Sequence, residues 1–286
     1  MKRKNSKLAW FVLVPAMTVF FLFHTLPLLQ GVFYSFTDFK GYGNWEFVGF
    51  RNYLNIFSDM RVRGAYVFTL SFSILSTILV NIISILIALG LNSKIKYHKT
   101  LRAIYFVPYM LGTLIIGYVF SFIFSRLLPQ IGTSLDISWL QFNMLGNPNL
   151  AWIGIVVVAV WQSAAFNTIL YLSGLVTIDP DLYEAADIDG AKPTTKFFNI
   201  TLPLIMPFFT INMVVAMKNF LMVFDQIIAL TGGGPGTSTE SVSLLIYRGG
   251  FQGGEFAYQS ANAVLFFIII AVISLFQIRV LERREN

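Results

Sequence analysis

Six long apolar runs constrain the fold of this chain more than any other feature. Each run has at least about 20 residues, and at 1.5 Å per residue a helix of that length crosses roughly 30 Å of hydrocarbon. The runs lie at about 8–29, 65–91, 104–124, 150–175, 204–230 and 257–280. The sequence therefore predicts an all-α, polytopic membrane protein with six transmembrane helices in a single domain, residues 1–286.

The composition argues against several other classes of protein. With 56% apolar, 16% aromatic and only 12% charged residues, the chain is too apolar for a soluble domain of 286 residues. It has no cysteine, and its two histidines, His24 and His98, lie far apart in the sequence, so no metal site is predicted. The formal charge of +6 does not indicate nucleic-acid binding, because the basic residues flank the apolar runs and form no single patch.

The basic residues also predict the orientation in the membrane. Six spans place both termini on one side, and that side carries thirteen Lys or Arg residues against six on the opposite side. By the positive-inside rule, the side with thirteen is cytoplasmic. The thirteen are Lys2, Arg3, Lys4, Lys7, Lys94, Lys96, Lys99, Arg102, Lys192, Lys196, Arg279, Arg283 and Arg284, and the six are Lys40, Arg51, Arg61, Arg63, Arg126 and Arg248.

The first apolar run follows a basic start, which is also typical of a signal peptide. The run is long enough to span a membrane, however, and no small-residue cleavage site follows it at the expected place. We therefore expect a retained first helix.

A polar segment between the fourth and fifth runs, residues 179–203, carries the local signals of a short helix. Asp179 suits the N-cap and Pro180 the first helical position, and Glu184 places negative charge near the positive end of the helix dipole. Gly190 suits the left-handed conformation that ends a helix. We expect a helix, a glycine elbow and a second short helix, together forming a docking element on the cytoplasmic side.

The same segment resembles a known family signature. Glu184-Ala185-Ala186 is followed after three residues by Gly190. Nine residues separate Gly190 from Ile200, and one residue separates Ile200 from Leu202-Pro203. This spacing resembles the EAA signature of the permeases of binding-protein-dependent ABC importers. The run 231–239, TGGGPGTST, resembles a further signature of the carbohydrate branch, the maltose- and glycerol-3-phosphate-type permeases. The resemblance covers essentially the whole chain.

The resemblance implies an ABC importer permease fold, a transport function and a set of partners. It implies that the chain is a transmembrane subunit and not an enzyme, in the cytoplasmic membrane of a bacterium, and that residues 179–203 form a coupling loop seated in a cleft of an ATPase. The expected partners are a second, similar permease, two ATPase subunits that bind ATP and Mg²⁺, an extracytoplasmic sugar-binding protein and the lipid bilayer, with no cofactor in this chain. The expected coupling residues are Tyr183, Glu184, Ala185, Ala186, Asp187 and Gly190.

Polar residues within the apolar runs are costly in a bilayer and are therefore informative. In the fifth run Asn212, Asn219 and Gln226 recur every seven residues, which predicts one polar helical face, with Lys218 and Asp225 in an adjacent stripe. Amides both donate and accept hydrogen bonds, as sugar hydroxyls require, and aromatic rings stack on sugar rings. The alternative is that these side chains bond to neighbouring helices. Further candidates for a substrate pathway are Trp161, Gln162, Asn167 and Tyr171 in the fourth run and Asn262 in the sixth.

Other polar positions favour structural roles. For the series Thr69, Ser73, Ser76 and Ser84 in the second run we expect bonds between helices. The glycine-rich run 231–239 does not match a phosphate-binding loop, because no Gly-Lys-Ser/Thr follows it, and we expect a tight external turn without ATP. The loop 125–149 holds prolines and glycines and is predicted to be irregular and extracytoplasmic, covering the end of the bundle or helping to receive a binding protein.

Two functions from other classes remain alternatives. A secondary transporter would work without an ATPase and would use the charges of Lys218 and Asp225 for ion coupling. A membrane scaffold would use the loop 179–203 for docking without transport. The spacing of the EAA-like signature favours the importer over both.

Overall fold

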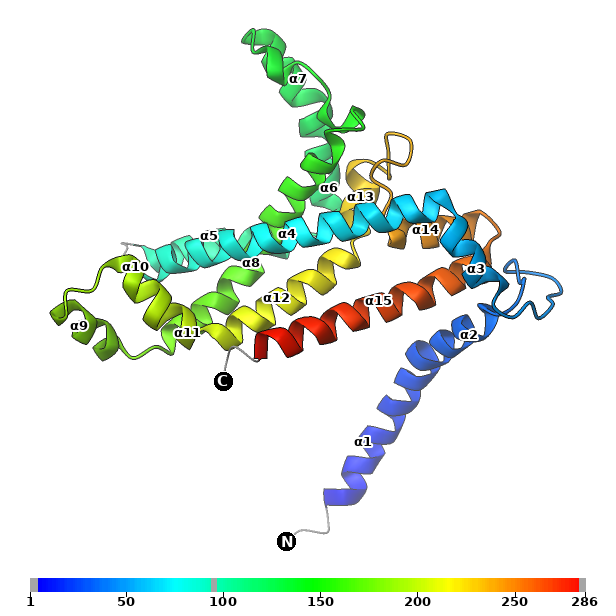
Figure 1. Ribbon diagram of the computed structural model, residues 1–286, viewed down its shortest axis with the longest axis horizontal. Coiled ribbons are helices and arrows are strands. Elements are labelled where there is room, and N and C mark those ends of the chain that lie inside the picture. Colours follow the sequence, from blue (N-terminus) through cyan, green and yellow to red (C-terminus); the bar gives the residue numbers. More distant parts are fainter. Residues whose placement is uncertain (1–4, 94–96, 283–286) are drawn as a thin grey trace. The chain divides into compact units, whose positions relative to one another are not determined.

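The computed structural model describes residues 5–93 and 97–282, whose regular structure is helical apart from one isolated antiparallel bridge between Thr37 and Phe47 (Figure 1). Contacts divide the chain into two compact units. One unit takes in the residues through Met60 together with Leu245–Ile268, and the other takes in Arg61–Leu244 and the residues from Ile269 onwards.

The first unit combines a long apolar helix with a loop rich in aromatic residues, residues 35–50. Asn52 fixes this loop, because its buried Nδ2 donates to the carbonyls of Ser35 at 2.9 Å and Thr37 at 2.7 Å. The Phe39 carbonyl accepts from the backbone N–H of Ala257 at 2.8 Å, which ties the loop to the sixth apolar run. The helices are α1 (Asn5–Phe20), α2 (Leu26–Tyr34), α3 (Arg51–Ser58) and the first part of α15 (Phe256–Glu282).

The second unit holds most of the predicted spans and the polar loop. Its largest apolar cluster joins α4, α6, α8, α12 and α13 through buried residues such as Phe72, Ile155 and Phe220. Its helices are α4 (Met60–Asn92), α5 (His98–Met110), α6 (Thr113–Phe122), α7 (Leu128–Ser134), α8 (Ala151–Val176), α9 (Pro180–Ile188), α10 (Pro193–Lys196), α11 (Leu202–Leu204), α12 (Met206–Leu221), α13 (Asp225–Leu230) and the first half of α14 (Val242–Tyr247), whose second half belongs to the first unit.

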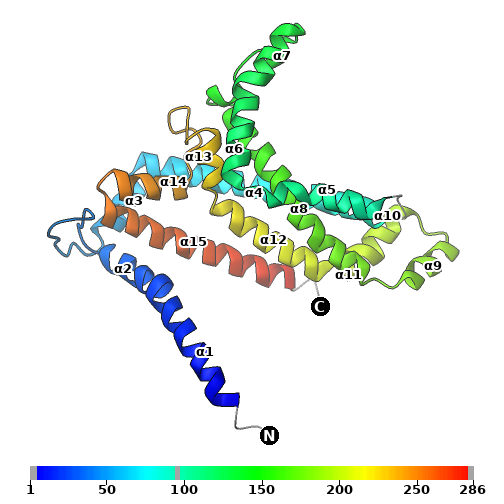
Figure 2. The same cartoon turned by 180° about the vertical axis from the view of Figure 1, so that it is seen from behind.

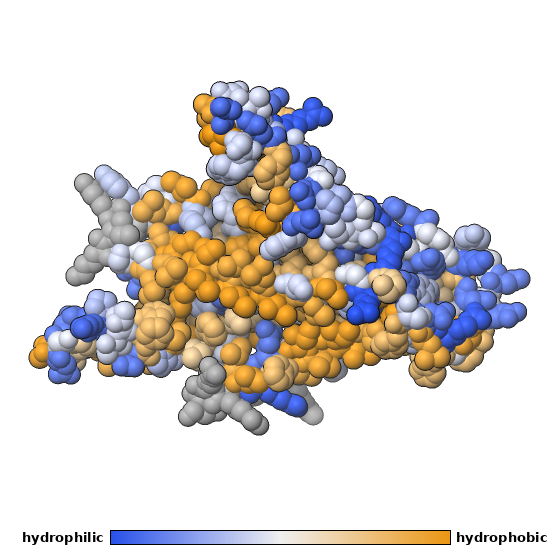
Figure 3. Space-filling view, turned by 45° about the horizontal axis from the view of Figure 1, so that its top comes forward, coloured by the Kyte–Doolittle hydropathy of each residue, from blue (hydrophilic) through white to orange (hydrophobic). Residues whose placement is uncertain are grey.

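The predicted membrane-spanning helices are confirmed in type and nearly in number. In the described part of the chain, five helices are long and apolar enough to cross a membrane, and a bent pair raises the number to six. Large apolar side chains are exposed along these helices, and Figure 3 shows hydrophobic residues over much of the visible face. Some basic residues that predict the orientation lie outside the described residues: Lys2, Arg3, Lys4, Lys94, Lys96, Arg283 and Arg284.

Two of the predicted spans are wrong as continuous helices. The third run is interrupted at Leu111 and Gly112, both in extended conformation, and helix then continues from Thr113 through Ser134. The expectation that the loop 125–149 is irregular is therefore wrong over its first part. At the start of the fifth run, the helical segments Pro193–Leu204 and Met206–Leu221 meet at a bend of 73°. The helix of this run then ends at Leu221, before α13 begins at Asp225.

Three prolines continue a helix because a π-turn precedes each of them. The turns Phe21–Thr25, Ile123–Leu127 and Phe197–Thr201 lie directly before the Leu-Pro pairs at Pro27, Pro129 and Pro203. In each turn the leucine N–H bonds to the carbonyl five residues earlier. The wider turn gives space for a residue that has no N–H and whose ring would otherwise clash with the preceding turn.

Candidate functional site

The polar loop forms the short helix that the sequence predicts, and both of its ends are capped. The Asp179 side chain accepts from the N–H of Asp181 at 3.0 Å. At the other end Gly190 has φ +69°, and its N–H donates to the Asp187 carbonyl at 3.1 Å. The N–H of Ala191 donates to the carbonyl of Ala186 at 2.9 Å. This pair of bonds is a Schellman motif, which fixes the direction in which the chain leaves α9.

Two side-chain contacts tie α9 to the segment that follows it. The Tyr183 hydroxyl and Thr201 Oγ1 are hydrogen bonded at 2.8 Å, and Lys196 forms an ion pair with Asp187. Tyr183 also packs against the buried cluster that contains Leu175. Tyr183 was expected to contribute to coupling, and in the structure its side chain packs inside the protein, where it holds α9 against the segment that precedes α12.

The remaining surface of α9 is open. Glu184 and Ala185 are exposed, Ala186 is half-buried, and Ile188 is 88% exposed. Both ribbon views place α9 beyond α10 and α11, at one extremity of the second unit (Figures 1 and 2). Ile188 was not selected in the sequence analysis. An isoleucine in the last turn of a polar helix could have indicated an exposed apolar contact residue. The exposed face combines small, acidic and apolar side chains and is suited to docking.

Three buried amides carry polar atoms that have no hydrogen-bond partner in the described chain. Asn212 on α12 is fully buried, and neither its Nδ2 nor its Oδ1 is paired. On α8 the oxygens of Asn167 and Gln162 are likewise buried and unpaired. Their nitrogens donate to backbone carbonyls, Asn167 to Ser163 at 2.8 Å and Gln162 to Leu111 at 3.3 Å. Because an unpaired buried group costs about 1–3 kcal/mol, these amides are suited to binding a polar molecule.

The expected stripe on the fifth span is not continuous. Lys218 and Asn219 are exposed in the last turn of α12, while exposed Asp225 and half-buried Gln226 belong to α13. No proline or glycine marks this break. The Val223 carbonyl accepts a hydrogen bond from the Ser241 hydroxyl at 2.9 Å instead of continuing the helix. A tertiary contact therefore overrides the seven-residue spacing that predicted one polar face.

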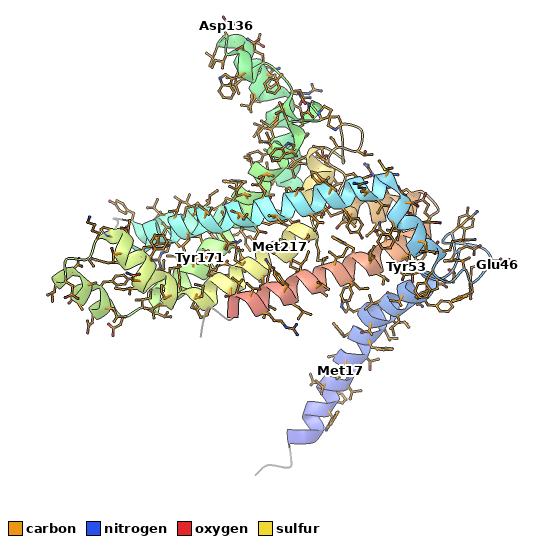
Figure 4. The ribbon with its side chains drawn as sticks, in the orientation of Figure 1. Met17, Glu46, Tyr53, Asp136, Tyr171 and Met217 are labelled. Atoms are coloured by element: carbon orange, nitrogen blue, oxygen red, sulfur yellow. The ribbon has the colours of Figure 1, made fainter. Side chains whose placement is uncertain are left out.

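The aromatic candidates on α8 differ from one another. Trp161 is 40% exposed, and its ring lies 5.2 Å from that of Phe120. Tyr171 is fully buried and donates to Asn81 Oδ1 on α4 at 2.6 Å. Figure 4 shows Tyr171 and Met217 between helices of the second unit. Tyr171 thus bonds to a neighbouring helix.

The remaining polar candidates bond within their own unit. Asn262 is fully buried in the first unit, where its Nδ2 donates to Gln259 Oε1 at 3.1 Å. On α4, Thr69 Oγ1 accepts from the Val242 N–H at 3.0 Å and Ser84 donates to the Ala164 carbonyl at 3.2 Å. The expected bonds between helices are confirmed for Thr69 and Ser84. The expectation is wrong for Ser73, whose hydroxyl donates to the Thr69 carbonyl of its own helix at 2.6 Å, and Ser76 Oγ is buried without a hydrogen-bond partner among the described residues.

An ion pair with a buried carboxylate lies just after the glycine-rich loop, and the sequence did not predict it. Arg61 Nε and Nη2 donate to the two carboxylate oxygens of Glu240, each at 2.8 Å. The Glu240 side chain is 1% exposed and that of Arg61 is half-exposed. The loop itself makes the predicted tight turn, with positive φ at Gly232, Gly233 and Gly236. The two partners lie 179 positions apart, so no local signal connects them.

Comparison with known proteins identifies the family. Residues 80–286 match the family described as the inner membrane component of binding-protein-dependent transport systems. The chain belongs to this family. It is 38% identical over 98% of its length to the multiple sugar-binding transport system permease protein MsmF of Streptococcus mutans, covering 97% of that protein. It is 35% identical to the trehalose/maltose transport system permease protein MalF of Thermococcus litoralis, covering 100% of this chain and 97% of that protein.

The structural comparison agrees with this membership. A chain in the crystal structure of a bacterial alginate ABC transporter, in complex with a periplasmic protein that holds an alginate pentasaccharide, matches with a TM-score of 0.84 and 26% identity. The match covers 99% of this chain and 96% of that chain. This member of the inner membrane component family is therefore a multi-pass transport subunit and not an enzyme, with the importer permease fold.

Proposed function

We propose that the chain forms half of the translocation pathway of an ATP-driven importer for sugars or oligosaccharides in the cytoplasmic membrane of a bacterium. The names of its relatives support a saccharide substrate: one is a multiple sugar-binding system, another a trehalose/maltose system. A second, similar permease completes the pathway, and an extracytoplasmic binding protein delivers the sugar. ATP and Mg²⁺ are bound by two ATPase subunits, not by this chain.

The capped α9 carries this proposal, because it is an exposed helix held firmly to a membrane span. The Tyr183–Thr201 hydrogen bond and the Asp187–Lys196 ion pair join α9 to the segment that precedes α12. When the ATPases close on ATP, they move α9 as a rigid unit, and these contacts transmit the movement to α12. The coupling free energy passes through this docking contact. Glu184 and Ala185 form the docked surface with Ala186, and Gly190 sets its orientation.

In the pathway, the buried amides bind sugar hydroxyls. Asn212, Asn167 and Gln162 each have an unpaired amide atom, and an amide oxygen or nitrogen matches a hydroxyl that both donates and accepts. Asn212 is fully buried in this conformation, so helix movement has to uncover it before a sugar can reach it. Trp161 offers an exposed ring for stacking. The exposed polar residues Lys218, Asn219 and Asp225 lie at the ends of α12 and α13, where they contact a sugar that enters or leaves.

Co-purification in mild detergent tests the proposal. The wild type is compared with Glu184→Lys on α9 and with Glu46→Lys, an equal charge reversal at an exposed loop of the other unit. We expect an ATPase and a second six-helix protein to accompany the wild type and Glu46→Lys, and the ATPase to be lost from Glu184→Lys. If the wild type purifies alone and still moves solute across liposomes without ATP, it is a secondary transporter and the proposal is wrong.

A further inference from the structure

A groove of about 410 Å³ lies between α5 and α8, and neither α9 nor the three unpaired amides contribute to its lining. Its walls are mostly apolar and include Phe106, Ile169 and Leu172. Ile169 is 40% exposed, so the groove is open at the helix surface. None of the described residues that line it is acidic.

One cationic group lies at the end of this apolar groove. Arg102 donates through Nη2 to the Leu91 carbonyl at 3.2 Å, which holds its guanidinium against the last turn of α4. Its Nε is buried and has no hydrogen-bond partner among the described residues. Leaving a charged donor unpaired is costly, so the site is suited to an anionic acceptor. Phosphate oxygens suit a guanidinium well, because its N–H groups form a planar fork.

The dimensions of the groove match one leaflet of a bilayer. Val176, the lining residue nearest to α9 in the sequence, lies three residues before Asp179, the N-cap of α9, and Arg102 lies near the start of α5. Along α8 the lining extends from Val176 to Ala165, which at 1.5 Å per residue is roughly 16 Å. That length is about half of the ~30 Å hydrocarbon core. With the orientation predicted from the basic residues, this arrangement matches Arg102 to the phosphate groups of the leaflet and the apolar walls to its acyl chains.

We propose that this groove binds one anionic phospholipid from the leaflet on the α9 side, with its phosphate on Arg102 and one acyl chain along α8. The negative charge of the cytoplasmic leaflet favours such binding at a basic pocket between helices. A basic residue near the membrane surface strengthens the binding of anionic lipid roughly fivefold. The proposal depends on the orientation of the chain, but not on which solute it transports.

Native mass spectrometry tests the proposal on the full chain, purified together with any subunits that accompany it. The probes are phosphatidylglycerol, phosphatidylcholine with the same acyl chains, and inorganic phosphate. We expect one phosphatidylglycerol to be retained, with at least a roughly fivefold preference over phosphatidylcholine, and no displacement by inorganic phosphate. Arg102→Gln removes the preference, and Ile169→Trp, which fills the groove, lowers the retention of both lipids. Arg279→Gln, an exposed arginine in the last turn of α15, leaves the retention unchanged.

Several outcomes overturn the proposal. Equal retention of the two lipids by the wild type excludes recognition of an anion, and unchanged retention by both groove variants places the lipid elsewhere. Displacement by inorganic phosphate means that Arg102 binds a free anion. A photo-crosslinker placed at Ile169 gives an independent measurement that does not require Arg102→Gln to fold. Crosslinking to a second protein subunit instead of lipid shows that a partner covers the groove.

Discussion

Replacing Gly190 tests whether the geometry of α9, and not merely its presence, is required for coupling. Gly190 has φ +69°, and a Cβ built at this position meets no atom within 4 Å. A substitution therefore strains the backbone without a clash inside this chain. An alanine in the left-handed conformation costs about 1–2 kcal/mol, asparagine costs less because its short polar side chain tolerates this region, and valine costs more because it is β-branched. The two hydrogen bonds of the Schellman motif, donated by Gly190 and Ala191, stabilise this conformation and oppose the effect of the substitution.

The expected effect is an ordered loss of coupling. A cost of 1–2 kcal/mol lowers the population of the capped loop about 5- to 30-fold. Apparent ATPase affinity and sugar-stimulated ATP hydrolysis in the reconstituted complex should fall in the order Gly, Asn, Ala, Val. Membrane insertion, measured as the abundance of the chain in membranes, should not change. The matched control is Gly64→Ala on α4, where a Cβ also meets nothing within 4 Å but the backbone is helical.

The order of the variants separates two explanations. If the loss came from close contact with an ATPase surface, the larger asparagine would be worse than alanine. If backbone strain is the cause, alanine is worse than asparagine. Wild-type coupling in Gly190→Val would refute the role of the capped elbow altogether, and a defect in Gly64→Ala would show that the assay reports nonspecific damage.

Three further predictions concern one hydrogen bond, one ion pair and one unpaired amide. Tyr183→Phe and Thr201→Ala each remove the 2.8 Å hydrogen bond, so each should weaken coupling by about 0.5–1.5 kcal/mol, and additive losses in the double variant would contradict a direct bond. Glu240→Gln should lower the stability of the detergent-purified protein by about 1.5–3 kcal/mol, because Arg61 loses a charged acceptor, and unchanged thermal unfolding would refute this. Asn212→Leu should reduce uptake without lowering the unfolding temperature, because two unpaired buried amide atoms are removed; wild-type uptake would exclude Asn212 from the pathway.

The sequence alone determined the features whose physical causes are local. Apolar runs of about 20 residues predict membrane helices because the length of a helix and the thickness of hydrocarbon are fixed quantities. The caps of α9 were predicted because Asp179 and Gly190 act within a few residues of their own positions. The family resemblance was carried by the same short stretch, together with the run 231–239.

The tertiary structure decided what distant contacts control. The break after Leu221 depends on the Ser241 hydroxyl reaching the Val223 carbonyl, so a seven-residue spacing could not reveal it. Glu240 is buried beside Arg61 only because the fold joins positions 179 residues apart. The depth of Asn212 is likewise a property of the packed helices. Local sequence sets helix propensity and the length of each apolar run. The pairing of buried polar groups depends instead on which helices become neighbours in the folded protein.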